Sequence, residues 1–327
     1  MPVPAPNLYP DFNIIRLSHV CLNVADLAVS KTFYTDIVGL QVTDESDSYI
    51  YLRAMEERGH HCIILQKSNQ PGTVEVMGFK TFDEADLDKA EAYFKSKGRP
   101  TSWVDRPYQG KTLLTSDNMG IPLEFYHKMD RLGPIHQKYA LYRGVKPLRI
   151  DHFNCFSNDV DASVEFYSDF GFRVTEYTED DDSKKLWAAW MHRKGGVHDM
   201  AFTNGTGPRM HHVAFWVPTP LNIIDLLDLM ATTGYVDNIE RGPGRHGISN
   251  AFFLYILDPD GHRIEIYCSD YQTVDPDHEP IKWDLQDPQR QTLWGAAAPE
   301  SWFKHGTRFV GVDTKDSGIK ASPIIAP

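Results

Sequence analysis

The chain contains an internal duplication, and this feature constrains its fold more than any other. Ser18-His19-Val20 resembles Asp151-His152-Phe153, which lies 133 residues further along the sequence. Internal repeats of this kind indicate repeated structural units. The same spacing joins five more residues of the first copy to identical residues of the second: Asp26 to Asp159, Ser30 to Ser163, Phe33 to Phe166, Tyr34 to Tyr167 and Asp36 to Asp169.

Each copy is itself double. A second strand-like segment starts at Val76-Met77-Gly78-Phe79 in the first copy and at residues 209–215 in the second, and residues 120–126 correspond to residues 261–267 at the two ends. Apolar residues at helical spacing follow the first strands of two of these units. They form the stripes Val29, Phe33, Ile37 and Ile223, Leu226, Leu227, Met230. The pattern predicts an α+β fold of four modules, each a strand, an amphipathic helix and further strands that end in a hairpin.

The repeat also predicts the domain organisation. We expect a first domain over residues 1–130, a linker over 131–147, a second domain over 148–270 and a C-terminal arm over 271–327. The arm is irregular and rich in Pro, Asp and Trp, and we expect it to cover the site of the second domain. Its last residues are expected to fray.

Composition excludes several classes of protein. The chain has 33 Lys and Arg against 45 Asp and Glu, a net charge of −12, so nucleic acid and anionic membranes are poor partners. Met1 to Pro10 holds four prolines and lacks the apolar core of a signal peptide. The four cysteines have no metal-site spacing and are expected to be free thiols, which favours a cytoplasmic location.

The second half contains a candidate metal site. His152 and His212 lie on the first strands of their modules and Glu265 lies on a last strand, with apolar neighbours that alternate to the opposite face. Two His and one carboxylate on one side of a ferrous ion leave positions open for substrate and oxygen. Each residue alone is more often structural than functional, and it is their joint placement at repeat-equivalent positions that favours a metal site.

The first half serves as an internal control. Its counterparts of the three ligands are His19, Phe79 and Glu124, and a phenylalanine cannot bind a metal. We therefore expect the first domain to be metal-free and structural.

The residues before Glu265 superficially resemble a calcium-binding loop. In Asp258-Pro259-Asp260-Gly261, however, Glu265 follows Gly261 by four residues rather than six, and strands flank the segment. A hairpin turn with a left-handed Gly261 fits better. Such a three-residue loop places Tyr255 opposite Glu265, with its hydroxyl toward the metal cavity.

Several long motifs give the chain a specific resemblance. Residues 151–154, 189–194, 197–199, 207–213, 240–247 and 256–267 resemble the homoprotocatechuate 2,3-dioxygenases, which are type I extradiol dioxygenases of the vicinal oxygen chelate superfamily. The match covers nearly all of the chain to about Trp302 and is densest after residue 148, whereas the residues after Phe303 remain unmatched. The resemblance implies that the modules pair into two barrel domains, and it suggests a cytoplasmic homotetramer.

The resemblance also implies roles for individual residues. It places Fe(II), with Mn(II) as the open alternative, on His152, His212 and Glu265. It makes His198 the acid–base group near the metal, and it places Asn154 near oxygen and Tyr255 near the substrate hydroxyl. It also implies that Trp190 and His246 line the pocket and that Arg241 and Arg290 bind a substrate carboxylate.

Side-chain chemistry fits these implied roles. An imidazole near neutrality can take up and return a phenolic proton, and a guanidinium offers two donors to a planar carboxylate. Without the resemblance, His198 would be interpreted as a surface-loop histidine and the two arginines as members of surface ion pairs.

The expected reaction is extradiol cleavage of 3,4-dihydroxyphenylacetate, or a close carboxylated catechol, by O2. The expected product is 5-carboxymethyl-2-hydroxymuconic semialdehyde, formed in aromatic compound degradation. Two alternatives stay open at this point: a metal-dependent lyase or isomerase of the glyoxalase type, and a non-catalytic protein of the same fold that binds aromatic ligands.

Overall fold

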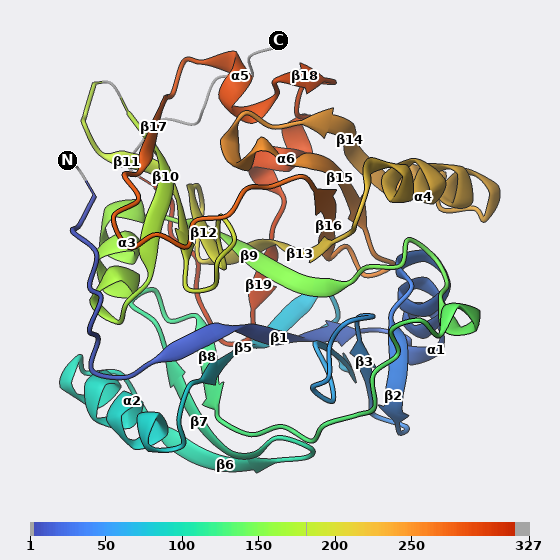
Figure 1. Ribbon diagram of the computed structural model, residues 1–327, viewed down its shortest axis with the longest axis horizontal. Helices are drawn as coiled ribbons and strands as arrows, with labels where there is room; N and C mark the ends of the chain where they lie inside the picture. Colours follow the sequence, from blue (N-terminus) through green and yellow to red (C-terminus); the bar gives the residue numbers. More distant parts are fainter. Residues whose placement is uncertain (1–2, 181, 318–327) are drawn as a thin grey trace.

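The computed structural model describes residues 3–180 and 182–317, and its two halves have the same architecture (Figure 1). Residues 318–327, the end of the expected arm, lie outside the described residues. The first half contains β1 (Ile14–Val24), α1 (Leu27–Thr32), the π-helix η1 (Phe33–Val38), β2 (Gln41–Glu45), β3 (Tyr49–Arg53), β4 (Ile63–Lys67), β5 (Thr73–Thr81), α2 (Ala85–Ser96), β6 (Ser102–Arg106), β7 (Gly110–Ser116) and β8 (Pro122–Tyr126).

The second half repeats this order after a connection that contains the short helix η2 (Tyr139–Leu141). Its elements are β9 (Arg149–Ser157), α3 (Val160–Asp169), β10 (Arg173–Glu179), β11 (Leu186–His192), β12 (Met200–Asn204), β13 (Arg209–Trp216), α4 (Pro220–Thr232), η3 (Val236–Asn238), β14 (Ile239–Arg245), η4 (Ile248–Asn250), β15 (Phe252–Leu257) and β16 (Arg263–Cys268). The prediction of four βαβββ modules is confirmed.

The modules of each half pair through their first strands. In the first half the strand order is β2-β3-β4-β1-β5-β8-β7-β6, with β1 and β5 antiparallel at the centre. In the second half the order is β10-β11-β12-β9-β13-β16-β15-β14, with β9 and β13 at the centre. The two sheets therefore have the same topology, strand for strand.

Repeat-equivalent residues begin the helices. The carboxylate of Asp26 accepts hydrogen bonds from the backbone N–H groups of Ala28 and Val29 at the start of α1, at 2.8 and 3.1 Å. Asp159 caps α3 in the same way, with 3.1 Å to the N–H of Ala162. An aspartate in this position satisfies backbone donors that have no partner inside the helix.

The predicted apolar stripes are correct for α4 and partly wrong for α1. Ile223, Leu226 and Met230 are buried and Leu227 packs against the same core. Val29, in contrast, is 47% exposed, although Phe33 and Ile37 are buried. The reason is that residues 33–38 form a π-helix, whose wider turn shifts the face that a 3.6-residue period would predict.

Two tyrosines tie the halves together reciprocally. Tyr34 of the first half donates its hydroxyl to Asp258 of the β15–β16 turn, at 3.0 Å. Its counterpart Tyr167 donates to Asp117 of the β7–β8 turn, at 3.2 Å. Gly261 has the left-handed φ of 87° that was expected of the β15–β16 turn. Each half thus uses a helix-borne phenol to hold the hairpin of the other.

Strands of the C-terminal arm pair with both edges of the second sheet and with a strand of each half. The arm comprises β17 (Ile281–Asp284), α5 (Pro288–Gln291), β18 (Trp294–Gly295), α6 (Glu300–Lys304) and β19 (Thr307–Phe309). Strand β17 joins β10 and β18 joins β14, at opposite edges of the second sheet. Strand β19 pairs with both β13 and β5, so it bridges the two halves (Figure 1). None of the described helices has the length and apolar character needed to cross a bilayer.

Candidate active site

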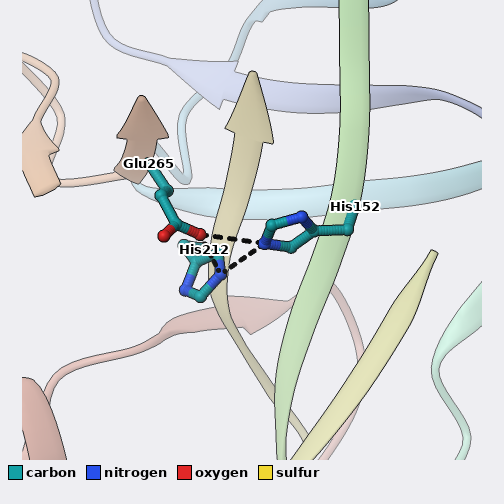
Figure 2. A group of neighbouring side chains, drawn as sticks. All are labelled: His152, His212 and Glu265. Atoms are coloured by element: carbon teal, nitrogen blue, oxygen red, sulfur yellow. Dashed lines mark hydrogen bonds and ion pairs between the residues drawn. The ribbon is translucent and has the colours of Figure 1, made fainter. Parts of the chain in front are cut away.

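Three side chains from three strands converge in the second half (Figure 2). Nε2 of His152, on β9, lies 3.2 Å from Nε2 of His212, on β13. Both nitrogens approach Oε2 of Glu265, on β16, at 2.9 and 3.2 Å. All three side chains are buried. Within the described part of the chain, no other set of three or more His, Cys, Asp or Glu brings its ligand atoms this close together.

The spacing of the three atoms fits a single divalent ion. Neighbouring ligands of an octahedral ion with bonds of about 2.1 Å are separated by about 3.0 Å. The three observed separations lie between 2.9 and 3.2 Å. Two imidazoles and one carboxylate on one side of the ion leave its other positions facing the cavity, as ferrous and manganous sites require.

The electrostatics of the group are consistent with a cation at its centre. Burial would raise the pKa of Glu265, but its close contacts with His152 and His212 lower it well below its usual value. Burial lowers the pKa of His212 to about 4. Burial also opposes the charge of His152, although its contacts with Asp151 and Glu265 raise its pKa overall. An ionised carboxylate beside a neutral imidazole is the state that binds a metal.

His198 and Asn154 lie beside this group. The ring of His198 is centred 3.8 Å from that of His152, and both His198 and Asn154 line the cavity. Burial, followed by the charge of His152, keeps the pKa of His198 well below its usual value. The amide oxygen of Asn154 accepts a hydrogen bond from Thr203, at 3.2 Å.

Tyr255 and His246 also line the cavity and form a hydrogen-bonded pair. Tyr255 pairs with Glu265 across β15 and β16, as the hairpin predicted. Nδ1 of His246 donates to the backbone carbonyl of Gln291, so in the neutral ring Nε2 accepts the hydroxyl proton of Tyr255, at 3.0 Å. Burial lowers the pKa of His246 to about 3, followed in effect by the charge of Arg241. The phenol is therefore oriented by a neutral imidazole.

The two arginines are buried. Arg290 lines the cavity, whereas Arg241 is not among its lining residues and packs over the rings of Phe253, Tyr255 and Trp302. Arg241 donates from Nη2 to Thr292, at 2.9 Å, but its Nε and Nη1 atoms have no hydrogen-bond partner among the described residues. Burial lowers the pKa of each guanidinium to about 10. Unpaired buried donors are costly, so these two groups remain available to an acceptor.

Sequence reasoning missed several residues around the cavity. The half-buried Trp190 was expected to line it and does, but the arm residues Trp302 and Phe303 line it as well. Asp151 accepts the Nδ1 proton of His152, at 3.1 Å, and Lys194 donates to the backbone carbonyls of both Asp151 and His198, at 2.6 and 2.7 Å. Asp151 directly precedes His152 in the sequence, and that position was the one available signal.

The strand register corrects one assignment in the first half. Gly78 pairs with both His19 and Glu124, as Ala214 pairs with His152 and Glu265. The counterpart of His212 is therefore Val76, two residues before Gly78, and not Phe79. Phe79 is buried and stacks on Phe125. The assignment of Phe79 was wrong because the short segment 76–79 has no residue that marks its register, but Val76 also cannot bind a metal.

Comparison with known proteins agrees with the fold. Residues 16–125 and 149–266 match the Glyoxalase/Bleomycin resistance protein/Dioxygenase superfamily, and the chain belongs to it. Within that superfamily the chain is similar to the homoprotocatechuate 2,3-dioxygenases. It is 42% identical to the enzyme from Brevibacterium fuscum, solved in complex with 3,4-dihydroxyphenylacetate, with a TM-score of 0.90 over 96% of this chain and 99% of that one.

Two further relatives cover most of the chain. The homoprotocatechuate 2,3-dioxygenase of Arthrobacter globiformis is 44% identical, with a TM-score of 0.88 over 93% of this chain and 95% of that one. The manganese-dependent 2,3-dihydroxybiphenyl 1,2-dioxygenase of Geobacillus genomosp. 3 is 31% identical over 86% of this chain and 93% of its own length. The resemblance to extradiol dioxygenases is thus confirmed.

Proposed function

We propose that this protein is an extradiol dioxygenase that opens the ring of 3,4-dihydroxyphenylacetate with O2 and forms 5-carboxymethyl-2-hydroxymuconic semialdehyde. The observation that carries the proposal is the convergence of His152, His212 and Glu265 in a buried cavity. These residues would hold Fe(II) or Mn(II), and their donor set fits either ion. When bound, the metal would act as a redox-active Lewis acid that binds a catechol and O2 side by side.

The other residues of the cavity have complementary roles in this proposal. The donors of Arg241, together with Arg290, would bind the substrate carboxylate, since a guanidinium matches the geometry of that group. Trp190 would pack against the ring and His246 would hold the hydroxyl of Tyr255 toward the substrate oxygen. These assignments place the carboxymethyl end of the substrate near the arm and its diol near the ligand atoms.

His198 is the proposed acid–base group. It lies beside His152 in the cavity, where an imidazole could take a proton from the substrate hydroxyl and return it later. Its backbone is fixed by Lys194, which donates to its carbonyl. Asn154, bonded to Thr203, is proposed to face the oxygen-binding side of the site.

Oxygen uptake tests the proposal. Protein loaded anaerobically with Fe(II) or Mn(II) should consume one O2 for each 3,4-dihydroxyphenylacetate and release the semialdehyde, while the metal-free protein should consume none. Metal analysis should be carried out on the same sample. Metal binding without oxygen uptake would favour a glyoxalase-type lyase or isomerase instead, and catechol binding without turnover would favour a sequestering protein.

The oligomer and the compartment are also proposals. The resemblance favours a homotetramer, which light scattering in solution would test. Four cysteines, all free and buried, fit a reducing compartment such as the cytoplasm.

A further inference from the structure

A second histidine stands directly before a proposed metal ligand. In a regular strand, consecutive side chains point to opposite faces. The pairing of β9 with β13 has a register shift between Met210 and His212, so His211 is the extra residue of a β-bulge. Bulges re-aim side chains. As a result, Nδ1 of His211 lies 2.7 Å from Nδ1 of His212.

The hydrogen bonds of His211 determine where its proton lies. Nε2 of His211 is 3.0 Å from the backbone carbonyl of Trp302, in α6 of the arm. A carbonyl only accepts hydrogen bonds, so Nε2 carries the proton. The ring is buried, where a second proton would leave a full charge removed from water at a high cost. The neutral ring therefore has a bare Nδ1, which accepts a proton from Nδ1 of His212.

We infer that His211 is a positioning residue, which fixes the tautomer of His212 and couples the C-terminal arm to the metal site. With its proton on Nδ1, His212 presents a free Nε2 lone pair toward Glu265 and His152. Asp151 does the same for His152 by accepting its Nδ1 proton. The inference deepens the proposed function and rests on it for the metal, but the tautomer itself is a property of the metal-free chain.

Arg263 fixes both ends of this chain of hydrogen bonds. Its Nη1 donates to the backbone carbonyls of His211 and His305, at 3.0 Å in each case. Its Nη2 donates to Glu240, at 2.7 Å, and the whole side chain is buried. A guanidinium thus bridges strand β13 and the end of helix α6, beside the hydrogen bond from His211 to Trp302.

The first half offers a natural comparison for the same position. The pairing of β1 with β5 also shifts between Cys21 and Leu22, which makes Glu75 the bulge residue before Val76. Glu75 accepts a hydrogen bond from Asn23, at 3.3 Å. The bulge is therefore common to both halves, whereas the imidazole occurs only where a ligand histidine follows.

Two variants of His211 separate its hydrogen bonding from its volume. In His211→Gln, the amide can still donate to the carbonyl of Trp302 and accept from His212. In His211→Leu, neither bond can form. Loss of a group that orients a ligand histidine typically weakens metal binding about 10–100-fold. We expect that loss in Mn(II) affinity for His211→Leu, and a value within about threefold of the wild type for His211→Gln, because the paired bonds persist.

Mn(II) titration followed by electron paramagnetic resonance would measure these affinities without turnover. Equal losses in the two variants, or unchanged affinity in His211→Leu, would overturn the inference. The tautomers can be determined independently by ¹⁵N NMR of histidine-labelled, metal-free wild-type protein, with His211→Gln used to assign the resonances. A proton on Nε2 of His212 would refute the inference even if His211→Leu did not fold. Failure of the wild type to bind Mn(II) or Fe(II) would instead refute the proposed function and leave the tautomer result standing.

Discussion

The two halves of the molecule have the same strand order and share some inner residues, yet only one can surround a metal with three ligands. His19 and Glu124 correspond to His152 and Glu265. Nε2 of His19 lies 2.6 Å from Oε1 of Glu124 in the buried interior of the first half. By strand register, His61 also corresponds to His198. The first half therefore has counterparts of two of the three ligands and of His198, and it lacks the third ligand.

A guanidinium distinguishes the first half further. Arg106 occupies the position that corresponds to His246 and approaches Oε2 of Glu124 at 3.1 Å. His19 and Gln109 bind the other oxygen of this carboxylate, at 2.6 and 2.8 Å. The charge of Glu124 is thus compensated by a guanidinium, whereas the ion-pair partners of Glu265 among the described residues are histidines. The two halves therefore differ at one ligand position and in the presence of a guanidinium beside the carboxylate.

The largest expected effect is on metal content. His212→Ala should reduce bound metal from about one per chain to nearly none, because the ion loses one of three protein ligands. The matched control is Val76→Ala at the corresponding position, together with His19→Ala, and both should keep the full metal content. Elemental analysis of the purified variants would measure this. Two metals per chain in the wild type, or loss of metal on His19→Ala, would contradict the proposed division between the halves.

The next largest effect should be on turnover. We expect His198→Phe to keep its metal and slow the reaction about 10²–10⁴-fold, as removal of a positioned acid–base group commonly does. His61→Phe, at the equivalent position of the first half, should turn over at the wild-type rate. Stopped-flow mixing of the anaerobic substrate complex with oxygen would show which step is slowed. Loss of metal from His198→Phe, or an equal effect of both variants, would contradict the proposed acid–base role of His198.

Much of this comparison could be predicted from the sequence. The repeat predicted the four modules, and the pairing of Tyr255 with Glu265 followed from the length of one turn. The counterpart of His212 could not be predicted, because a bulge shifts the register of β5 and Val76 resembles any other core residue. The exposed face of α1 was missed for a similar reason, since the π-helix is not apparent in an apolar spacing.

The contribution of the arm to the site also could not be predicted from the sequence. Its tryptophans indicated packing, but the contact that matters for His211 is made by the backbone carbonyl of Trp302. A backbone group gives no signal in the sequence. For the same reason, the unpartnered donors of Arg241 became visible only in the folded chain.

A smaller effect is expected on substrate choice. The position that corresponds to Arg241 in the first half is Ser102, which lacks a charge. Arg241→Met should lower kcat/KM for 3,4-dihydroxyphenylacetate about 10–150-fold, because it removes a charge-assisted hydrogen bond. This corresponds to a loss of roughly 1.5–3 kcal/mol in transition-state stabilisation. Arg290→Met should act in the same direction. With uncharged 4-methylcatechol the change should be slight. Equal losses on both substrates would mean that the arginines are structural.

Rebuilding the lost site should give a modest gain. Val76→His combined with Arg106→Ala restores a second imidazole and removes the competing guanidinium. We expect this variant to bind a second Mn(II) weakly, because the surrounding residues have not adapted to orient the new ligand. Val76→His alone should bind none, since Arg106 still compensates Glu124. Calorimetric titration would count the sites. A second site in Val76→His alone would show that the guanidinium does not matter.

The last prediction concerns stability at low pH. Burial would raise the pKa of Glu124, but the hydrogen bond and charge of His19, followed by the charge of Arg106, lower it from 4.5 to about 2. A carboxylate whose pKa is lower in the folded state contributes stability above its unfolded pKa and loses that contribution as the pH falls. The contribution, on the order of 3 kcal/mol at full strength, should thus be present at pH 6 and decline between about pH 4.5 and 2. Urea unfolding of metal-free wild type and Glu124→Gln at pH 6 and pH 3 would test this, and metal-free protein is needed because the ligands of the second half also titrate. The difference in unfolding free energy between the two proteins should shrink at pH 3. If it is the same at both pH values, Glu124 is not held as the anion of an ion pair, and the proposed electrostatic difference between the halves is wrong.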